Sequence, residues 1–339
     1  RPSQICKTLP VSLTNDTTMT NDRQNKIPKQ YLAIGLTCLF GWTFAYLATN
    51  VFKDYALGLF IWLPLVMGAS STILFAYNNS TTKRNCRNIS FLTLLIFCVG
   101  LLTFAFEGII CIAMAAPIGL FFTWLGFLIG WQIVNKKLVG SPPTTLTILI
   151  LSVPALMSFE YATKENDDQV KPIVTTIEIN ASAETVWKNV VEFPQLDEPT
   201  EFIFRTGIAY PINAKIVGQG VGAVRHCNFS TGSFVEPITV WDEPRLLKFD
   251  VVDQPEPMTE LSFYDLHPNH LHGYFVSKQG QFKLTTLPNG HTLLEGTTWY
   301  YNKIRPTFYW TIWSDFIVHK IHERVLTHIK TQSEHGTAE

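Results

Sequence analysis

The sequence is poor in charge. Charged residues make up 16% of its 339 residues and hydrophobic residues 47%, whereas soluble domains carry about 25% charged residues. Part of the chain is therefore expected to avoid water. The formal net charge of −1 also lacks the strong positive excess of proteins that hold nucleic acid, so we expect no nucleic-acid partner.

The chain also lacks paired cysteines. No C-x-x-C occurs, and only Cys227 lies in the second half, which therefore cannot form an internal disulfide. Neither a disulfide scaffold nor a cysteine zinc site is predicted. Most of the other cysteines lie in or beside apolar stretches, where Cys packs as a small hydrophobe. The polar N-terminal segment 1–30 has no apolar core of a secretory signal.

Five apolar stretches without Asp, Glu, Lys or Arg follow one another, at about 31–52, 55–77, 89–106, 108–134 and 144–159. A spanning helix needs about 20 mostly apolar residues, so we predict five transmembrane helices within a membrane region at 31–160. Glu107 interrupts an apolar region too long for one span, and we predict a turn there at the membrane surface. Because no span holds Asp, Glu, Lys, Arg or His, we expect an anchor rather than an ion-coupled transporter.

Basic residues are distributed unequally between the loops. One side of the predicted membrane carries most of them: Arg23, Lys26, Lys29, Lys83, Arg84, Arg87, Lys136 and Lys137. The positive-inside rule places this side, and the N-terminus, in the cytoplasm. Five spans then predict a multi-pass integral membrane protein whose second half is extracytoplasmic.

The second half follows a polar linker at 161–172 and changes to strand patterns. Residues 173–179 alternate apolar and polar side chains, a helix is predicted at 183–193, and strands separated by turn residues continue to about 300. The Gly-rich segment 218–222 is predicted as a hairpin, because no helix follows it as a dinucleotide loop requires. A long helix is predicted at about 307–330, which completes an α+β domain at 173–332.

Three segments of this half carry a family resemblance: 177–187 (IEINASAETVW), 234–249 (FVEPITVWDEPRLLKF) and 293–300 (LLEGTTWY). They resemble the START-like superfamily, also called SRPBCC, of polyketide cyclases and lipid-transport proteins. The resemblance implies a helix-grip fold, with a curved antiparallel sheet around a long C-terminal helix and an apolar cavity between them. It also implies lipids, sterols or polyketides as ligands. Some members of the superfamily are enzymes, and many are carriers.

The C-terminal helix offers a candidate metal site. Asp315, His319 and His322 share one helix face, and carboxylate and imidazole suit zinc. The simpler interpretation is a solvated outer face, because a helical wheel puts Trp310, Trp313 and other apolar residues nearly opposite. We therefore predict no metal and no cofactor. His270-Leu-His272 is interpreted as the start of a strand.

Arg225 and Glu236 lie on adjacent predicted strands, where a cross-strand ion pair is the simplest interpretation. The alternative is a polar anchor inside an apolar cavity. His226 points to the face opposite Arg225. No catalytic residues stand out at a recognisable spacing.

Five large aromatic residues open the C-terminal helix, and some of them should line a cavity or touch the bilayer interface. The expected function is a membrane-anchored domain that binds a lipid-like ligand between the sheet and this helix. The alternatives are a cyclase or hydrolase using the same cavity, and a structural or signalling protein whose domain binds another protein. The candidate ligand-binding residues are Trp310, Trp313, Ile317, Ile321, Trp299, Arg225 and Glu236.

Overall fold

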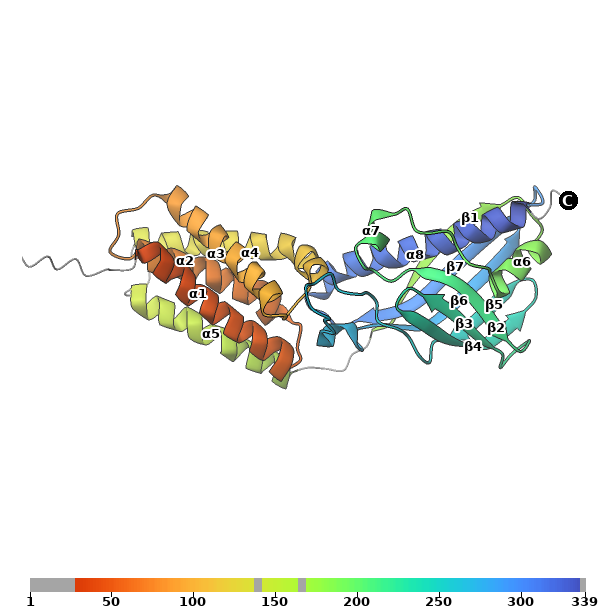
Figure 1. Cartoon of the computed structure of the whole chain (residues 1–339), viewed down its shortest axis with the longest axis horizontal. Coiled ribbons are helices and arrows are strands. Elements are labelled where there is room, and N and C mark those ends of the chain that lie inside the picture. The colour runs from red at the N-terminus through yellow and green to blue at the C-terminus, as the bar shows by residue number, and fades with distance from the viewer. Residues whose placement is uncertain (1–27, 137–141, 164–168, 336–339) are drawn as a thin grey trace, which may run out of the picture.

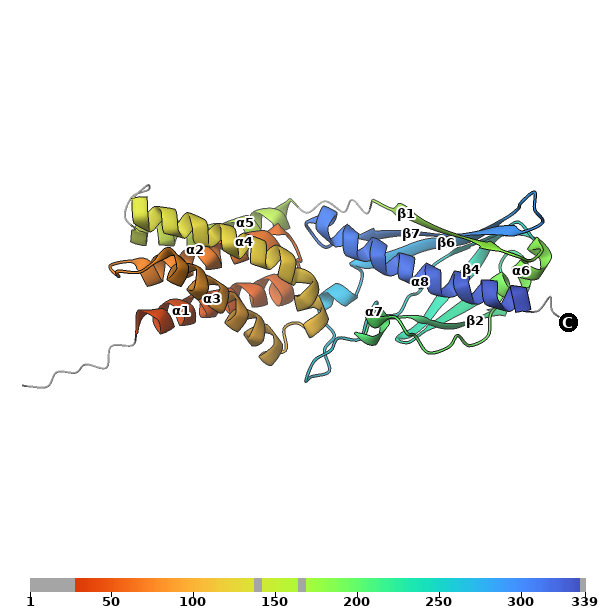
Figure 2. The same ribbon diagram turned by 90° about the horizontal axis from the view of Figure 1, so that it is seen from above.

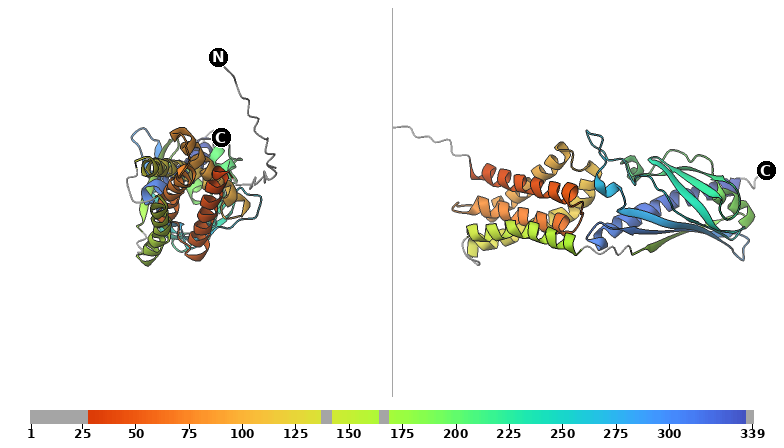
Figure 3. Two further views of the ribbon diagram at one scale, coloured as in Figure 1. Left: turned by 90° about the vertical axis from the view of Figure 1, so that its left-hand side faces the viewer. Right: turned by 90° about the horizontal axis from the view of Figure 1, so that it is seen from below.

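The chain forms two lobes arranged end to end, a helical bundle and a sheet-and-helix domain (Figures 1 and 3). The computed structural model describes residues 28–136, 142–163 and 169–335. Residues 1–27 of the predicted N-terminal segment and residues 164–168 of the predicted linker lie outside these residues.

The bundle consists of five helices that lie side by side. They are α1 (Lys29–Tyr46, extended by the π-helical turn Leu47–Val51), α2 (Leu63–Ala76, preceded by the π-helical turn Gly58–Trp62), α3 (Lys83–Thr103), α4 (Ile109–Lys136) and α5 (Pro142–Ala162). Within the described residues, five helices are long and apolar enough to cross a membrane. The turn predicted at Glu107 is present between α3 and α4.

Small residues bring α2 and α4 into close contact. A Cβ added at Gly126 would lie 2.0 Å from the carbonyl oxygen of Leu65, and one added at Gly68 would lie 2.3 Å from that of Thr123. Such small-residue interfaces are typical of helices that pack inside lipid. The Thr72 and Ser90 hydroxyls, 2.8 Å apart, link α2 to α3.

One end of the bundle faces the domain. The amide of Asn269 donates to the carbonyl oxygen of Thr49 at 2.9 Å, and the backbone N–H of Arg305 donates to that of Tyr55 at 2.9 Å. At the other end, the Lys29 ammonium bonds the carbonyl oxygens of Tyr77 and Asn78 at 3.0 and 2.7 Å. The basic starts of α1 and α3 therefore lie at the end of the bundle away from the domain.

The domain is a curved seven-stranded antiparallel sheet that wraps around one long helix (Figure 2). The sheet order is β1-β7-β6-β5-β4-β3-β2. The strands are β1 (Lys171–Ile179), β2 (Pro211–Val217), β3 (Val224–Phe229), β4 (Gly232–Asp242), β5 (Leu246–Asp250), β6 (Phe275–Thr286) and β7 (Thr292–Asn302). The helices are α6 (Ala183–Val191), α7 (Phe202–Arg205) and α8 (Thr307–His335). The predicted helix-grip fold is confirmed.

The segment between β5 and β6 differs from the sequence prediction. His270 and Leu271 belong to a 3-10 turn at Asn269–Leu271 instead of starting a strand, and β6 begins only at Phe275. β6 then continues without a break to Thr286. The long connection between β5 and β6 reaches the bundle, and it therefore lacks the alternating pattern of a strand.

The polar face of α8 was wrongly predicted to be solvated. The Thr175 hydroxyl of β1 lies 2.8 Å from His319 Nδ1 and 3.0 Å from His322 Nδ1. Asp315 pairs with Lys171 and accepts from the Tyr300 hydroxyl. Because the sheet curls around α8, two faces of the helix point inward, and hydrogen bonds to β1 and β7 occupy the polar one.

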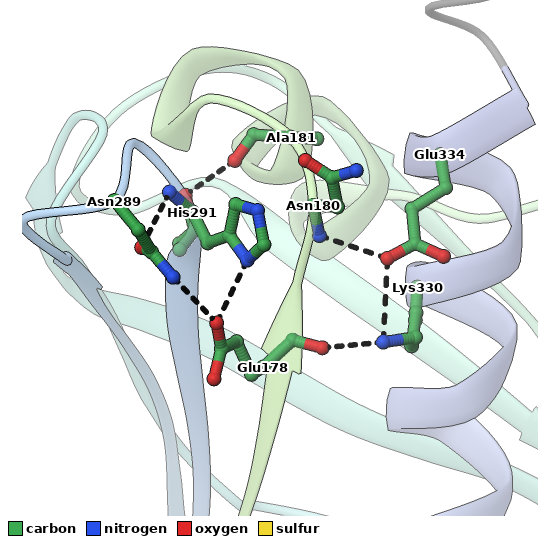
Figure 4. A network of polar contacts seen from close by, with 8 residues as sticks. Glu178, Asn180, Ala181, Asn289, His291, Lys330 and Glu334 are labelled. Carbon is green, nitrogen blue, oxygen red and sulfur yellow. Dashed lines mark hydrogen bonds and ion pairs between the residues drawn. The ribbon is translucent and has the colours of Figure 1, made fainter.

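A polar network closes the domain end farthest from the bundle (Figure 4). The Glu178 carboxylate of β1 lies 2.7 Å from His291 Nδ1 and accepts from the Asn289 amide at 3.0 Å. On α8, Lys330 donates to the carbonyl oxygen of Glu178 at 2.6 Å and pairs with Glu334 at 3.3 Å. These contacts fix the C-terminal part of α8 against β1.

Candidate functional site: an apolar cavity at the junction of the two lobes

A cavity of about 420 Å³ lies where the bundle meets the domain. Its volume is within the range of about 300–1,000 Å³ typical of small-molecule sites. Both lobes line it: Leu59, Leu94 and Met114 come from the bundle, and Phe275 and Trp313 from the domain. The cavity thus connects the space between the apolar helices with the space between sheet and α8.

Four of the predicted ligand-binding residues line this cavity. They are spaced along one face of α8: Trp310, Trp313, Ile317 and Ile321. Trp310 is 5% exposed and packs edge-on against Phe60 of the bundle, with ring centroids 4.9 Å apart. The aromatic start of α8 therefore joins the lobes and forms one wall of the cavity.

Exposed residues of α3 and α4 belong to the lining of the cavity. Leu95 of α3 and Leu120 of α4 both line it, although these residues are 60% and 47% exposed. We infer from this that the cavity opens to the outer surface of the bundle between α3 and α4. Gly119, next to Leu120, also lines the cavity, and a Cβ added there would have no neighbour within 4 Å.

Arg225 and Glu236 line a second, inner cavity of about 120 Å³ within the domain. They form a buried cross-strand ion pair, which confirms the simplest interpretation of the sequence. The guanidinium also donates to the carbonyl oxygen of Val191 at 3.3 Å and lies 5.4 Å from the Phe249 ring. Burial lowers the pKa of Arg225, but the Glu236 carboxylate and Cys227 together outweigh it and leave that pKa above its usual value. Arg225 therefore stays charged inside an aromatic cage.

Trp299, also among the predicted ligand-binding residues, lines neither of these two cavities. Its neighbours Thr298 and Tyr300 both bond residues of α8. Because successive side chains of a strand point to opposite faces, Trp299 lies on the outer face of β7. There the Lys248 ammonium lies 5.1 Å from its ring centroid.

A cluster of four ionisable side chains lies at the junction, and the sequence did not predict it. Glu107 and Cys111 come from the α3–α4 turn and the start of α4, and Glu260 and His270 from the β5–β6 connection. Cys111 Sγ lies 2.5 Å from Glu260 Oε1 and 3.0 Å from His270 Nε2. His270 Nδ1 lies 3.7 Å from Glu107 Oε2. Three of the four line the cavity at the junction of the two lobes, called the junction cavity below: Glu107, Cys111 and His270.

Burial dominates the electrostatics of this cluster. It raises the pKa of Glu107 to about 8, with a further rise from the Glu260 carboxylate and an opposing effect of the nearby Tyr55 hydroxyl. Burial likewise raises the pKa of Glu260, although contacts with Cys111 oppose it. Burial also lowers the pKa of His270 to about 4. Charged forms of these groups are therefore unfavourable unless a counter-charge is present.

Residues 172–300 match the family described as "Polyketide cyclase / dehydrase and lipid transport". The match agrees with the resemblance seen in the sequence and covers less than half of the chain. Comparison with curated proteins finds no significant match.

Solved structures similar to this chain include a truncated norcoclaurine synthase from Thalictrum flavum, with 15% identity and a TM-score of 0.33. The match covers 52% of this chain and 99% of the norcoclaurine synthase chain. The major latex-like protein 151 from Panax ginseng has 14% identity and a TM-score of 0.31, over 48% of this chain and 97% of its own. A protein from Nitrosospira multiformis has 16% identity and a TM-score of 0.32, over 50% of this chain and 100% of its own.

Proposed function

We propose that this protein is a membrane-anchored binder of a hydrophobic or amphipathic, lipid-like ligand, held in the junction cavity. The observation that carries the proposal is the continuity of the cavity from the α3–α4 opening to the apolar face of α8. In a bilayer, the opening at Leu95 and Leu120 would face acyl chains. A lipid would then reach the domain without crossing water.

The magnitudes are compatible with this proposal. Burying about ten methylene groups yields roughly 8 kcal/mol, and association costs at least about 4 kcal/mol. The difference corresponds to roughly millimolar binding. Two features strengthen the binding of a lipid. The ligand is already concentrated in the bilayer, and polar groups of Gln254, Asn302 and Ser314 lie in the cavity wall. A neutral or weakly polar headgroup suits this wall.

The family match supports ligand binding by the domain, because its description includes lipid transport. The five-helix anchor sets this chain apart from a soluble carrier. A tethered domain cannot diffuse between membranes, so we infer that it extracts, presents or senses a ligand of its own membrane.

The test uses the full-length protein, delipidated in detergent and titrated with a fluorescent fatty acid. We expect saturable uptake, energy transfer from Trp310 and Trp313 to the probe, and competition by an unlabelled lipid. Absence of saturable uptake for acyl, sterol and aromatic probes alike would refute the carrier function and leave the protein-interaction alternative.

An enzyme is the second candidate, because ionisable side chains converge on the cavity wall at Glu107, Cys111 and His270. A cyclase or hydrolase would chemically change the ligand that it binds. Mass analysis of the ligand recovered after incubation separates the two functions: a carrier returns it unaltered, and an enzyme returns a product that Cys111→Ser fails to form.

A further inference from the structure

The junction cluster has the composition of a transition-metal site. It brings together one thiol, one imidazole and two carboxylates, and one candidate ligand atom from each lies within 4.8 Å of the others. Zinc binds sulfur at about 2.3 Å, histidine nitrogen at about 2.0–2.1 Å and carboxylate oxygen at about 2.0–2.2 Å. In a tetrahedral site two such ligand atoms lie about 3.3–3.8 Å apart, so side-chain movements of about 1 Å would bring this cluster into that geometry.

The polar atoms of the cluster are buried and incompletely bonded, which is a second and independent observation. His270 is 7% exposed and Glu260 6% exposed. Among the described residues, His270 Nδ1, Glu260 Oε2 and both carboxyl oxygens of Glu107 form no hydrogen bond of good geometry, although the Tyr55 hydroxyl lies near Glu107. Buried polar atoms with incomplete bonding are costly in a folded protein, and an ion bound between them would satisfy them.

The charge of the cluster is also unbalanced. In the described part of the chain, no Lys or Arg forms an ion pair with Glu107 or Glu260. Two carboxylates and a thiolate would place up to three negative charges in a buried space, and a divalent cation would balance two of them.

The backbone is shaped for close approach at this point. A Cβ added at Gly108 would lie 1.9 Å from Glu260 Oε2. Next to it, the N–H of Ile109 donates to the carbonyl oxygen of Leu261 at 3.0 Å. The absence of a side chain at Gly108 therefore lets the β5–β6 connection rest directly on the α3–α4 turn.

We propose that Glu107, Cys111, Glu260 and His270 bind a zinc-type transition-metal ion that clamps the β5–β6 connection onto the bundle. The thiol argues against Mg²⁺ and Ca²⁺, which prefer oxygen ligands, and favours zinc. Two ligands come from each lobe, so the ion fixes the domain against the bundle at the cavity wall. This inference is independent of the proposed lipid binding, because it concerns the cavity wall and not its contents.

The test begins with metal analysis of the full-length protein, purified without chelator and after removal of any affinity tag. We expect about one zinc ion per chain, and a lower melting temperature after extraction of the metal. The apo protein is then titrated with Co²⁺, which we expect to produce a thiolate-to-cobalt charge-transfer band.

Conservative variants identify the ligands. We expect Cys111→Ser to abolish the charge-transfer band, and the matched control Cys98→Ser, in α3, to keep it. His270→Asn should weaken metal binding at least about tenfold, whereas His272→Asn should not, because the His272 side chain is 61% exposed.

Two results would overturn the proposal: failure of the folded apo wild type to bind Zn²⁺ or Co²⁺ saturably, and persistence of the thiolate band in Cys111→Ser. In either case hydrogen bonds, and not a metal ion, hold the four side chains together. The first result does not depend on whether the variants fold, because it is obtained with the wild-type protein.

Discussion

Arg225 of β3 and Glu236 of β4 form an ion pair that is almost completely enclosed, with side chains 2% and 8% exposed. The guanidinium is surrounded by the rings of Phe193, Phe249 and Phe282, at 5.4–5.6 Å from their centroids. A charge in such a site depends on its partner, since water cannot replace it.

We expect Arg225→Ala to destabilise the protein by about 3–5 kcal/mol, because Glu236 would be left buried and unpaired. The double variant Arg225→Met/Glu236→Leu should be much less destabilised, since no charge remains. Arg245→Ala, which breaks the exposed pair with Asp242, is the control and should change little. Urea unfolding of the full chain in detergent measures all three, and equal losses in the single and double variants would contradict the expectation.

Trp313→Ala should weaken binding of a fluorescent fatty acid by about tenfold or more, because it removes part of the cavity wall. Phe308→Ala is the matched control on the same helix end, where the side chain is 73% exposed and does not line the cavity. Melting temperatures must be recorded for both, since loss of Trp from a core can itself cost about 3–5 kcal/mol. Equal weakening by the two substitutions in folded proteins would argue against the assigned wall.

His322 should make folding stability fall in acid. Burial, with a smaller effect of His319, lowers the pKa of His322 in the folded domain to about 4, from the usual 6.5. Between these values the unfolded chain binds a proton that the folded chain does not, so stability decreases as pH falls from about 6.5 to 4. His322→Gln should flatten this part of the stability–pH curve, measured by thermal unfolding. An unchanged curve would mean that other groups cause the acid sensitivity.

The orientation in the membrane remains a prediction from the basic residues. Lys29 and Lys83 open α1 and α3 at the bundle end away from the domain, and Lys136 ends α4. We therefore expect, in intact cells, that an impermeant thiol reagent labels Glu198→Cys on the domain, and labels Ser80→Cys in the α2–α3 loop only after permeabilisation. The parent protein controls for its own cysteines, and the reverse labelling pattern would invert the topology.

Local patterns were sufficient to predict much of this structure. The five apolar stretches became helices because their backbone groups can be satisfied within each segment. The Arg225–Glu236 pair could be predicted because a short turn sets the register of β3 and β4. Trp310 and Trp313 line the junction cavity, as expected from their place on the apolar side of the helix.

The junction cluster and the buried polar face of α8 depend on contacts between distant parts of the chain. Cys111 and His270 are 159 residues apart in the sequence, and each has a simpler interpretation alone, as a small hydrophobe and as the start of a strand. His319 was placed in solvent because a helical wheel assumes one buried face, whereas the curled sheet encloses α8 from two sides. The one signal of the junction cluster in the sequence was Glu107, a carboxylate among apolar residues.

The most direct measurement of lipid binding in the junction cavity compares two glycine substitutions by native mass spectrometry of the full-length protein released from membranes. Gly119→Phe fills the cavity at its α3–α4 opening, whereas Gly35→Phe places the same side chain on α1 away from the cavity, and an added Cβ meets nothing within 4 Å at either position. We expect a lipid-sized adduct on the wild type and on Gly35→Phe, and its loss or a severalfold reduction on Gly119→Phe at unchanged melting temperature. An adduct equally abundant on all three proteins, or absent from the folded wild type, would contradict the assignment of this cavity as the ligand site.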